Sequence, residues 1–374
     1  MSKIYIIAVA YEPNTAPTNR LLSFIDSFDR MSVAIEVVFI NPNHKRDELQ
    51  RNYENVGFRY LWSKSIVNSR IYDKLLSGSR VRHFCRQLKS GDKVFLFGAS
   101  SYLHYFISRK GIDVYHERTE HPDVVCLKFG FERKRYLACC KKLSGLFVIS
   151  TALKEYFVST GVLEEKITIV NMTVNPARFN DIQKDKSVER YIAYCGTASN
   201  NKDGVNKLIE AFGIVAQKHK NVKLYIIGKS PSGVDESGNL QLIERLSLID
   251  RVVFTGIIEA EKMPQLLTNA TILALARPDS LQARNGFPTK LGEYLLTGNP
   301  VVVTKVGDIP LFLKDGENAL LAESGDVKEF ASKLCWALEH PVEAAIMGSK
   351  GREVAIRNFN SISESQKIIT CISE

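Results

Sequence analysis

A chain of 374 residues, 45% hydrophobic and 24% charged, is typical of a folded globular protein and long enough for two α/β domains. Its net charge of +9 belongs to the first half, because residues 1–170 hold 26 Lys and Arg against 17 Asp and Glu, whereas residues 171–374 hold 24 of each. No apolar run reaches the length of a membrane span, the N-terminus lacks a signal-peptide layout, and the seven scattered cysteines suit a reducing cytoplasm.

The first half of the chain alternates predicted strands with predicted helices. Apolar side chains at helical spacing predict a helix around residues 21–28, and residues 66–89 read as a second helix with a break near Gly78. Residues 41–65 read as polar and irregular. Such alternation indicates a mostly parallel sheet with helices on both faces. Strands are expected at residues 4–10, 34–40, 94–97, 112–115 and 146–149.

The second half repeats this pattern after a polar, turn-rich join at residues 171–188. We therefore expect a domain over residues 1–175, a second over residues 176–357, and a tail over residues 358–374 that packs back on the first domain. The strands of the second series are expected at residues 191–194, 222–227, 252–254, 272–276 and 301–303. Its helices are expected near residues 203–219, 236–249, 261–269, 326–339 and 342–357.

One stretch of the second half suits a phosphate-bearing ligand. Residues 277–287 read as a loop, Pro288 suits the first turn of a helix, and Gly298 suits its end. A loop after a parallel strand opens at the carboxyl edge of the sheet, where α/β folds bind ligands. Lys290 and Glu293 share one face of the predicted helix, where a cation could hold a diphosphate and a carboxylate could accept from ribose hydroxyls. The alternative is an ordinary surface Lys–Glu pair.

Two α/β domains in tandem form a cleft, and ligands usually bind there. The residues expected to face it lie in the loops that follow the carboxyl ends of the strands. In the second domain these loops are residues 196–204, 228–230 and 256–258. In the first domain they are residues 11–20, 98–101 and 116–122.

Several short motifs follow one another in a fixed order over the second half. They are Gly196 with Lys202-Asp203-Gly204, then residues 224–228, 252–256, 290–294, 298–302, 306–310 and 316–321. Their order and spacing resemble the nucleotide-sugar domain of retaining glycosyltransferases of family four; the first half matches loosely. The resemblance implies an α/β protein of the GT-B class, with two Rossmann-like, doubly wound domains facing across a cleft.

The resemblance also assigns roles to single residues. Lys202 corresponds to the family's pyrophosphate-binding lysine, and Glu293 to the second glutamate of its paired-glutamate motif. The first glutamate is replaced by Asn285, and an arginine frequent in the family is replaced by Thr197. Positive charge at the diphosphate must then come from Lys202 with Lys290, Arg277 or Arg284. The expected donor-binding residues are Gly196, Thr197, Lys202, Gly228, Ile257, Arg277, Asn285, Gly286, Phe287, Lys290 and Glu293.

The loop after the strand at residues 112–115 holds two carboxylates and two imidazoles. Its functional reading is contact with the donor sugar or the acceptor hydroxyl, and the alternative is a solvated polar loop. The catalytic residues are expected to be Lys202, Glu293, Asn285, Glu120 and His121. The acceptor-side residues are expected to be Asn14, Thr15, Glu117 and Arg118.

The chemistry that the resemblance implies is transfer of a sugar from a nucleoside-diphosphate sugar to a glycan or lipid-linked acceptor, with retention. Fixed cations would stabilise the leaving diphosphate. We expect no metal and no cofactor beyond the nucleoside-diphosphate sugar, which is a co-substrate, and no nucleic-acid partner. A sugar-nucleotide epimerase or hydrolase of the same fold and a non-catalytic, hinged binding protein are the alternatives.

Basic and aromatic side chains are interleaved between residues 128 and 142. This pattern suits an anionic membrane surface or a lipid-diphosphate acceptor, which predicts a cytoplasmic protein held at the inner face of the membrane. The alternative is a solvated helix face. The residues concerned are Lys128, Arg133, Lys134, Arg135, Lys141 and Lys142, with Phe129 and Tyr136 among them.

Overall fold

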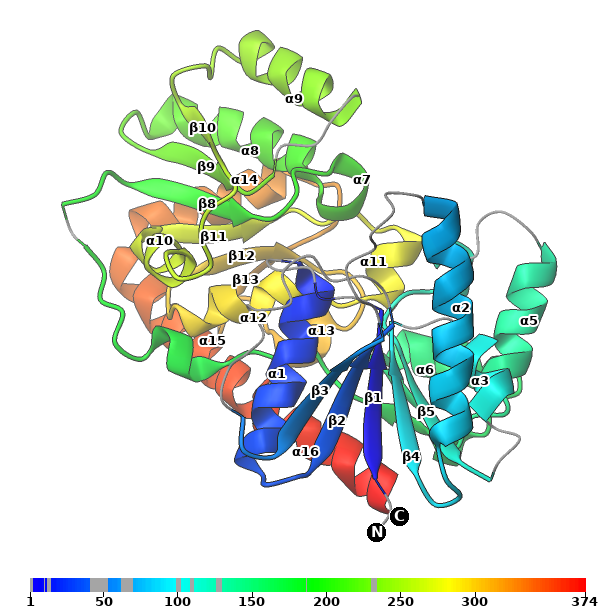
Figure 1. Cartoon of the computed structure of the whole chain (residues 1–374). Coiled ribbons are helices and arrows are strands. Elements are labelled where there is room, and N and C mark those ends of the chain that lie inside the picture. Colours follow the sequence, from blue (N-terminus) through cyan, green and yellow to red (C-terminus); the bar gives the residue numbers. More distant parts are fainter. Residues whose placement is uncertain are drawn as a thin grey trace. The chain divides into compact units, whose positions relative to one another are not determined.

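The computed structural model describes residues 3–9, 11, 15–40, 53–61, 70–98, 102–107, 111–125, 130–185, 187–229 and 234–374. The chain divides into two compact units. Figure 1 colours the whole chain along its sequence, from blue at the N-terminus to red at the C-terminus. Unit 1 comprises Met1–Asn171 and Ser361–Glu374, and unit 2 comprises Met172–Asn360. The chain therefore leaves unit 1 after residue 171 and returns to it with its last helix.

Unit 1 contains a parallel sheet that, in the described part of the chain, has the order β3-β2-β1-β4-β5-β6-β7. The strands are β1 Ile4–Ala8, β2 Ile35–Phe39, β3 Val56–Tyr60, β4 Lys93–Phe97, β5 Asp113–Arg118, β6 Gly145–Val148 and β7 Ile167–Ile169. The helices are α1 Ala16–Arg30, α2 Arg70–Gln87, α3 Tyr102–Ile107, α4 Pro122–Val125, α5 Gly130–Cys140, α6 Thr151–Ser159 and α16 Ser361–Ser373.

The predicted first helix is confirmed, and its apolar stripe forms one side of the unit 1 core. Phe24 of α1 packs against Phe95 of β4, with ring centroids 6.3 Å apart. Helix α16 completes this core from the other end of the sequence, because it lies against α1 and buries Ile368 and Ile372 (Figure 1). The last residues of the chain are thus part of the hydrophobic core of unit 1.

Unit 2 contains a second parallel sheet, of order β10-β9-β8-β11-β12-β13. The strands are β8 Tyr191–Cys195, β9 Lys223–Ile227, β10 Val252–Gly256, β11 Ile272–Leu275, β12 Val301–Thr304 and β13 Leu320–Ala322. The helices are α7 Asn200–Asp203, α8 Val205–Lys218, α9 Val234–Arg245, α10 Met263–Asn269, α11 Leu281–Asn285, α12 Thr289–Leu296, α13 Ile309–Phe312, α14 Val327–Glu339 and α15 Pro341–Asn358.

Three of the predicted elements were wrong. Val56–Tyr60 is a strand inside the region read as irregular, and its charged Arg59 pairs with Glu36 on the neighbouring strand. Helix α2 continues through Gly78 without a break, since a single glycine costs a helix only about 1 kcal/mol. The predicted loop at residues 277–287 contains helix α11, which Ser280 caps by accepting a hydrogen bond from the Ala283 N–H.

None of the described helices combines the length and the hydropathy that a membrane span requires. The strand and helix alternation of both units follows from buried apolar strands, such as β12 and β11, flanked by amphipathic helices. In each unit the carboxyl ends of the parallel strands share one edge of the sheet, and this edge is where the loops expected to bind ligands begin.

A buried ion pair fastens the first helix of unit 1 to its sheet. Nε of Arg20 in α1 donates to Glu117 of β5 at 2.8 Å, and both side chains are only 6% exposed. The same guanidinium donates to the carbonyl oxygens of Val170 and Asn171 at 3.0 and 2.8 Å. Glu117, predicted on the acceptor side, therefore neutralises an arginine that ties three segments of the fold together.

We predict that Glu117→Ala will lower the free energy of unfolding by about 3–5 kcal/mol, because it leaves a buried guanidinium without its counter-charge. Denaturant unfolding measures this loss. The control is Glu36→Ala, which breaks the ion pair of Glu36 with Arg59. Because Glu36 is more exposed than Glu117, this change should cost about 1 kcal/mol or less. Equal losses for the two variants would contradict a structural role for Glu117.

Candidate functional site

Three glycines end three adjacent strands at the carboxyl edge of the unit 2 sheet. Gly196, Gly228 and Gly256 follow or end β8, β9 and β10, with φ of +144°, +128° and +70°. The Gly228 N–H donates to the Gly256 carbonyl at 3.0 Å, and a Cβ on Gly228 would lie 2.6 Å from the Gly196 oxygen. This edge is therefore lined by backbone, which lets a ligand approach closely.

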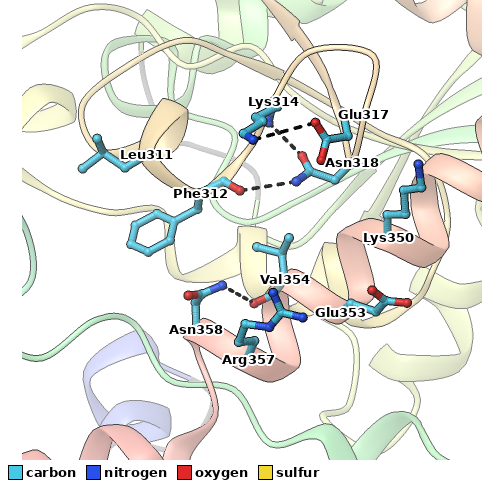
Figure 2. Close-up of a pocket in the computed structure, with 10 residues that line it drawn as sticks. All are labelled: Leu311, Phe312, Lys314, Glu317, Asn318, Lys350, Glu353, Val354, Arg357 and Asn358. Atoms are coloured by element: carbon cyan, nitrogen blue, oxygen red, sulfur yellow. Dashed lines mark hydrogen bonds and ion pairs between the residues drawn. The ribbon is translucent and has the colours of Figure 1, made fainter.

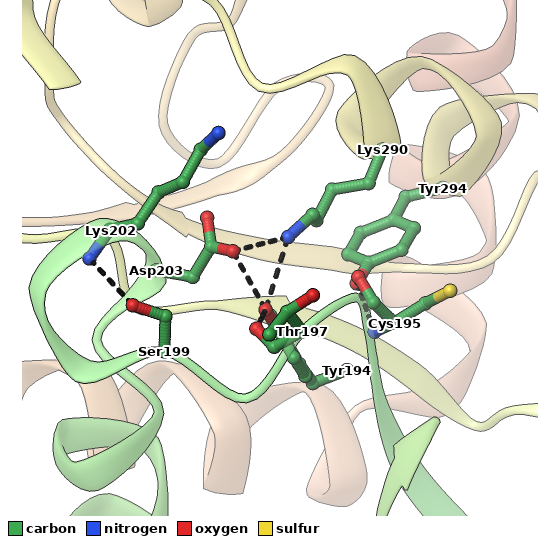
Figure 3. A network of polar contacts seen from close by, with 8 residues as sticks. All are labelled: Tyr194, Cys195, Thr197, Ser199, Lys202, Asp203, Lys290 and Tyr294. Carbon is green, nitrogen blue, oxygen red and sulfur yellow. Dashed lines mark hydrogen bonds and ion pairs between the residues drawn. The ribbon is translucent and has the colours of Figure 1, made fainter. Parts of the chain in front are cut away.

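A buried ion pair stands beside Gly196. Nζ of Lys290 in α12 donates to Asp203 at 2.5 Å and to the Tyr194 hydroxyl at 3.1 Å, as Figure 3 shows. The side chains of Lys290 and Asp203 are 17% and 5% exposed. The ammonium also lies 4.6 Å from the centre of the Tyr194 ring, within the range of a cation–π contact. A Cβ on Gly196 would come within 2.5 Å of Nζ, so glycine leaves room for this lysine.

The electrostatics of the pair follow from burial and from charge. Burial lowers the pKa of Lys290, and the charge of Asp203 opposes this shift. Burial alone would raise the pKa of Asp203, but the charge of Lys290 and the hydrogen bonds from Lys290 and Tyr194 outweigh it and lower this pKa. Burial raises the pKa of Tyr194 well above its ordinary value, so its hydroxyl stays protonated and donates to Asp203 at 2.7 Å.

Local sequence fixes the position of Asp203. Ser199 caps the short helix α7, and Gly204 ends it in the left-handed conformation with φ of +68°. A Cβ on Gly204 would lie 1.9 Å from the Ala276 carbonyl oxygen, so this turn packs directly against the end of β11. Arg277 follows at once, is 2% exposed, and acts electrostatically on both Asp203 and Lys290.

A second ion pair lies on the same helix, one turn further on. Arg178, in the 3₁₀ turn Pro176–Phe179, donates from Nη1 to Oε1 of Glu293 and from Nη2 to the Ala260 carbonyl at 3.0 Å. Lys290 and Glu293 thus have different partners, and the reading of them as an ordinary surface pair is wrong.

Both ion pairs surround the end of strand β8. Burial raises the pKa of the Cys195 thiol to about 12, and Glu293, Lys290, Arg178 and Asp203 all act on it electrostatically. The Tyr294 hydroxyl accepts a hydrogen bond from the Cys195 N–H at 2.5 Å, which ties α12 to the strand (Figure 3). Two cations and two carboxylates therefore converge on one strand end beside the glycine-lined edge.

Part of unit 2 is similar in sequence to a known protein family. Residues 189–340, which lie within unit 2, match the family model described as glycosyl transferases group 1. This part of the chain is therefore similar to the group 1 glycosyl transferases. The resemblance predicted from the order of the motifs is confirmed.

The curated relatives share about a quarter of their residues with the aligned part of this chain. The chain is 26% identical over 232 residues to the capsular polysaccharide biosynthesis glycosyltransferase CapM of Staphylococcus aureus, covering 58% of each chain. It is 27% identical over 157 residues to N-acetyl-alpha-D-glucosaminyl L-malate synthase of Bacillus anthracis, covering 42% of this chain and 38% of the relative. The chain thus spans about half the length of the curated relatives it matches.

Solved structures resemble the whole chain. Anabaena HepE, crystallised with UDP, has a TM-score of 0.76 at 19% identity, with 99% of each chain covered. A mutant of TarM from S. aureus, in complex with UDP among other ligands, has a TM-score of 0.78 at 14% identity, with all of both chains covered. These likenesses show the fold, which is the predicted GT-B class of α/β protein.

The predicted donor residues of unit 2 fall into three sets. Gly196, Gly228, Arg277, Lys290 and Glu293 lie at or beside the strand ends described above. Thr197 and Ile257 lie at exposed loop positions, Ile257 with 72% of its surface exposed, and Lys202 lies at an exposed position of α7.

The third set consists of three residues that are buried within unit 2. The ring of Phe287 is 7% exposed and packs against Phe312 and Phe359. Gly286 is buried, and its φ of −100° is one that any residue can adopt. The backbone conformation therefore does not require a glycine at this position. The Asn285 amide donates to the Leu281 carbonyl at 2.9 Å, within α11.

Arg284 differs from the other candidates for the diphosphate, because its guanidinium is exposed and forms a two-point ion pair with Asp279 at 2.6 and 2.7 Å. Among the cations that the sequence suggested, Lys290 and Arg277 flank the carboxylate of Asp203, and Lys202 stands on the exposed side of α7.

The predicted residues of unit 1 are placed by the fold of that unit. Thr15 caps α1 by accepting from the Thr18 N–H at 3.4 Å, and the Arg118 guanidinium lies 4.2 Å over the Tyr136 ring. The ring of His121 packs against Tyr156 at a tilt of 59°, and burial lowers the pKa of His121, which favours the neutral imidazole. Glu120 is half-buried, and Asn14 lies outside the described residues.

From the sequence, no role was predicted for Tyr194, Tyr294, Asp203, Cys195 or Arg178. Asp203 could have been found from its place directly after Lys202 in a motif of the family, and Tyr294 from its place directly after Glu293. Arg178 carried no local signal, because it is separated from Glu293 by 115 positions.

Two other features of unit 2 lie outside the predicted set. Figure 2 shows a groove of about 450 Å³ with Lys314 and Glu317 on one side and Lys350, Glu353 and Arg357 of α15 on the other. Its charges are of both signs. Among the described residues, the side chains that could together hold a metal ion are His219, Cys335 and Glu339, whose ligand atoms lie within 4.8 Å of one another.

We predict that Gly228→Ala will lower the free energy of unfolding by more than about 2 kcal/mol, because left-handed strain adds to a clash with the Gly196 backbone. Thermal and denaturant unfolding measure the loss. The matched control is Gly256→Ala, also at positive φ but with no atom of a described residue within 4 Å of its added Cβ, which should cost about 1–2 kcal/mol. If both variants lose the same stability, the close approach of the two strand ends has no energetic role.

Proposed function

We propose that the chain transfers a sugar from a nucleoside-diphosphate sugar to a glycan or lipid-linked acceptor, with retention of configuration. The observation that carries the proposal is the convergence of Lys290, Arg277 and Asp203 beside the glycine-lined edge of a group 1 glycosyl transferase domain. A buried cation at a backbone-lined edge suits a diphosphate, since fixed charge in a partly dry site acts strongly on developing negative charge.

In this mechanism the bond between the anomeric carbon and the diphosphate oxygen breaks, and its electrons go to the leaving phosphate. Lys290 and Lys202 stabilise that charge, and Arg277 adds to the positive potential. The acceptor hydroxyl attacks from the same face and passes its proton to the departing phosphate. This route needs no protein base, and no metal or other cofactor takes part in it.

Glu293 is assigned to the ribose hydroxyls, and Asn285 to a sugar hydroxyl. Gly196, Thr197, Gly228, Ile257, Gly286 and Phe287 complete the proposed donor site. Support for the nucleoside comes from the neighbours: HepE has been crystallised with UDP-glucose and TarM with UDP. Glu120 and His121 remain proposed catalytic residues, and Asn14, Thr15, Glu117 and Arg118 remain proposed acceptor-side residues. The alternative, a sugar-nucleotide epimerase or hydrolase, differs from this proposal because its reaction requires no glycan or lipid-linked acceptor.

We predict that a screen of UDP-, GDP- and ADP-sugars will find one nucleotide class that raises the melting temperature. Binding to the native state alone adds about 2.7 kcal/mol of stability when the ligand is at one hundred times its Kd. Differential scanning fluorimetry identifies the class, and product analysis with and without glycan acceptors follows. Turnover that needs no acceptor would support the epimerase or hydrolase, and no stabilisation by any of these ligands would overturn the proposal.

We also propose that basic residues in α5 and directly after it hold the protein at an anionic membrane surface on the cytoplasmic side. Lys134, Arg135, Lys141 and Lys142 are exposed, whereas Arg133 is engaged by Asp123 at 2.6 Å. Aromatic side chains contribute less to this proposed membrane-binding surface than the sequence suggested. Tyr136 is buried under Arg118, and Lys128 and Phe129 lie outside the described residues.

We predict that the protein will float with anionic vesicles at low salt and that changing those four exposed side chains to Gln will release it. Each basic residue near an anionic surface contributes about 1 kcal/mol, and salt screens the attraction. The control variant loses the same charge from unit 2, with Gln at four exposed lysines. These are Lys218, Lys220, Lys262 and Lys328. Equal release of both variants would indicate that net charge, not α5, determines binding.

A further inference from the structure

Arg178 belongs to a short, well-anchored turn at the start of unit 2. Asn175 caps this turn by accepting a hydrogen bond from the Ala177 N–H at 3.1 Å. The next side chain, Phe179, is 3% exposed, so the turn is fixed on both sides of Arg178. The guanidinium therefore starts from a backbone that is held in place, which limits how far it can move.

The two ends of the guanidinium hold two different segments. Nη2 donates to the carbonyl oxygen of Ala260, in the loop after β10, at 3.0 Å. Nη1 donates to Oε1 of Glu293 on α12. The planar fork of an arginine fixes the direction of both bonds at once, which a lysine ammonium cannot do. The Glu293 carboxylate is thus oriented relative to the loop that follows β10.

The pair remains open to a ligand. The side chains of Arg178 and Glu293 are 36% and 27% exposed. Within the part of the chain that the structure describes, the Glu293 carboxylate accepts hydrogen bonds through Oε1 alone. Both charges act on Cys195, as do Lys290 and Asp203, so the carboxylate lies near the strand end where the diphosphate is proposed to bind. A bare carboxylate there would repel a diphosphate, and the arginine offsets that repulsion.

We propose that Arg178 is a positioning residue for the donor: it fixes the Glu293 carboxylate so that Oε2 can accept from the ribose hydroxyls, and it neutralises the carboxylate next to the diphosphate. This inference rests on the proposed function, because it requires a nucleoside diphosphate at the site. The segment at the start of unit 2 thus directly affects how tightly the donor binds.

The test compares UDP with its 2′,3′-dideoxy analogue by calorimetric titration, using the GDP pair instead if GDP is the nucleotide that stabilises the wild type. Arg178→Ala should weaken UDP binding about tenfold or more, the value of a charge-assisted hydrogen bond. It should weaken dideoxy-UDP binding less, because that analogue keeps the repulsion between the bare carboxylate and the diphosphate but lacks the ribose hydroxyls. Arg178→Lys should recover only part of the loss. Arg178→Ala combined with Glu293→Ala should bind UDP no more weakly than Glu293→Ala alone.

Two controls distinguish a folding defect from a specific loss of UDP affinity. Melting temperatures without ligand report the fold, and Lys333→Ala, which removes a similar ion pair with Asp315 in unit 2, should leave UDP affinity unchanged. Tighter UDP binding in Arg178→Ala would overturn the proposal by showing that the arginine blocks the carboxylate. Equal losses for UDP and the dideoxy analogue would overturn it by showing no ribose-directed role. Failure of the wild type to bind either nucleotide would instead remove the proposed function.

Discussion

The ion pair between Lys290 and Asp203 is the interaction on which the proposed site depends. A lysine ammonium that is mostly shielded from water is costly unless an opposite charge and hydrogen bonds compensate for it, and Asp203 and Tyr194 supply both. This compensation needs Gly196 to leave space for the ammonium and Gly204 to bring Asp203 close to the end of β11. Small residues and charged residues of the site are therefore parts of a single arrangement.

The same logic explains why the site holds two ion pairs and not isolated cations. The pairs Lys290–Asp203 and Arg178–Glu293 stand about one helical turn apart on α12 and converge on Cys195. Without a ligand, their charges nearly cancel. An incoming diphosphate can draw on the cations, while Glu293 is available for hydroxyl groups, so the arrangement suits a ligand that carries both an anion and a sugar ring.

Much of the architecture could be predicted, because buried parallel strands and amphipathic helices leave periodic patterns. Strand β3 escaped prediction since Gly57 and Arg59 interrupt its apolar pattern. The shared helix face of Lys290 and Glu293 was predictable from their spacing, but their partners were not. Asp203 lies 87 positions from Lys290, and only the order of the strands brings the two loops to one edge. Family resemblance named the glutamate and not the arginine that holds it.

The central claim is that Lys290 binds the diphosphate, and a comparison of UDP with uridine measures this most directly. In the wild type, UDP should bind far more tightly than uridine in a calorimetric titration. Lys290→Met keeps an apolar stem in the same place but removes the charge, so it should reduce the ratio of the two affinities by tenfold or more, as for a lost charged hydrogen bond of about 1.5–3 kcal/mol. An unchanged ratio in a folded Lys290→Met variant would contradict the account.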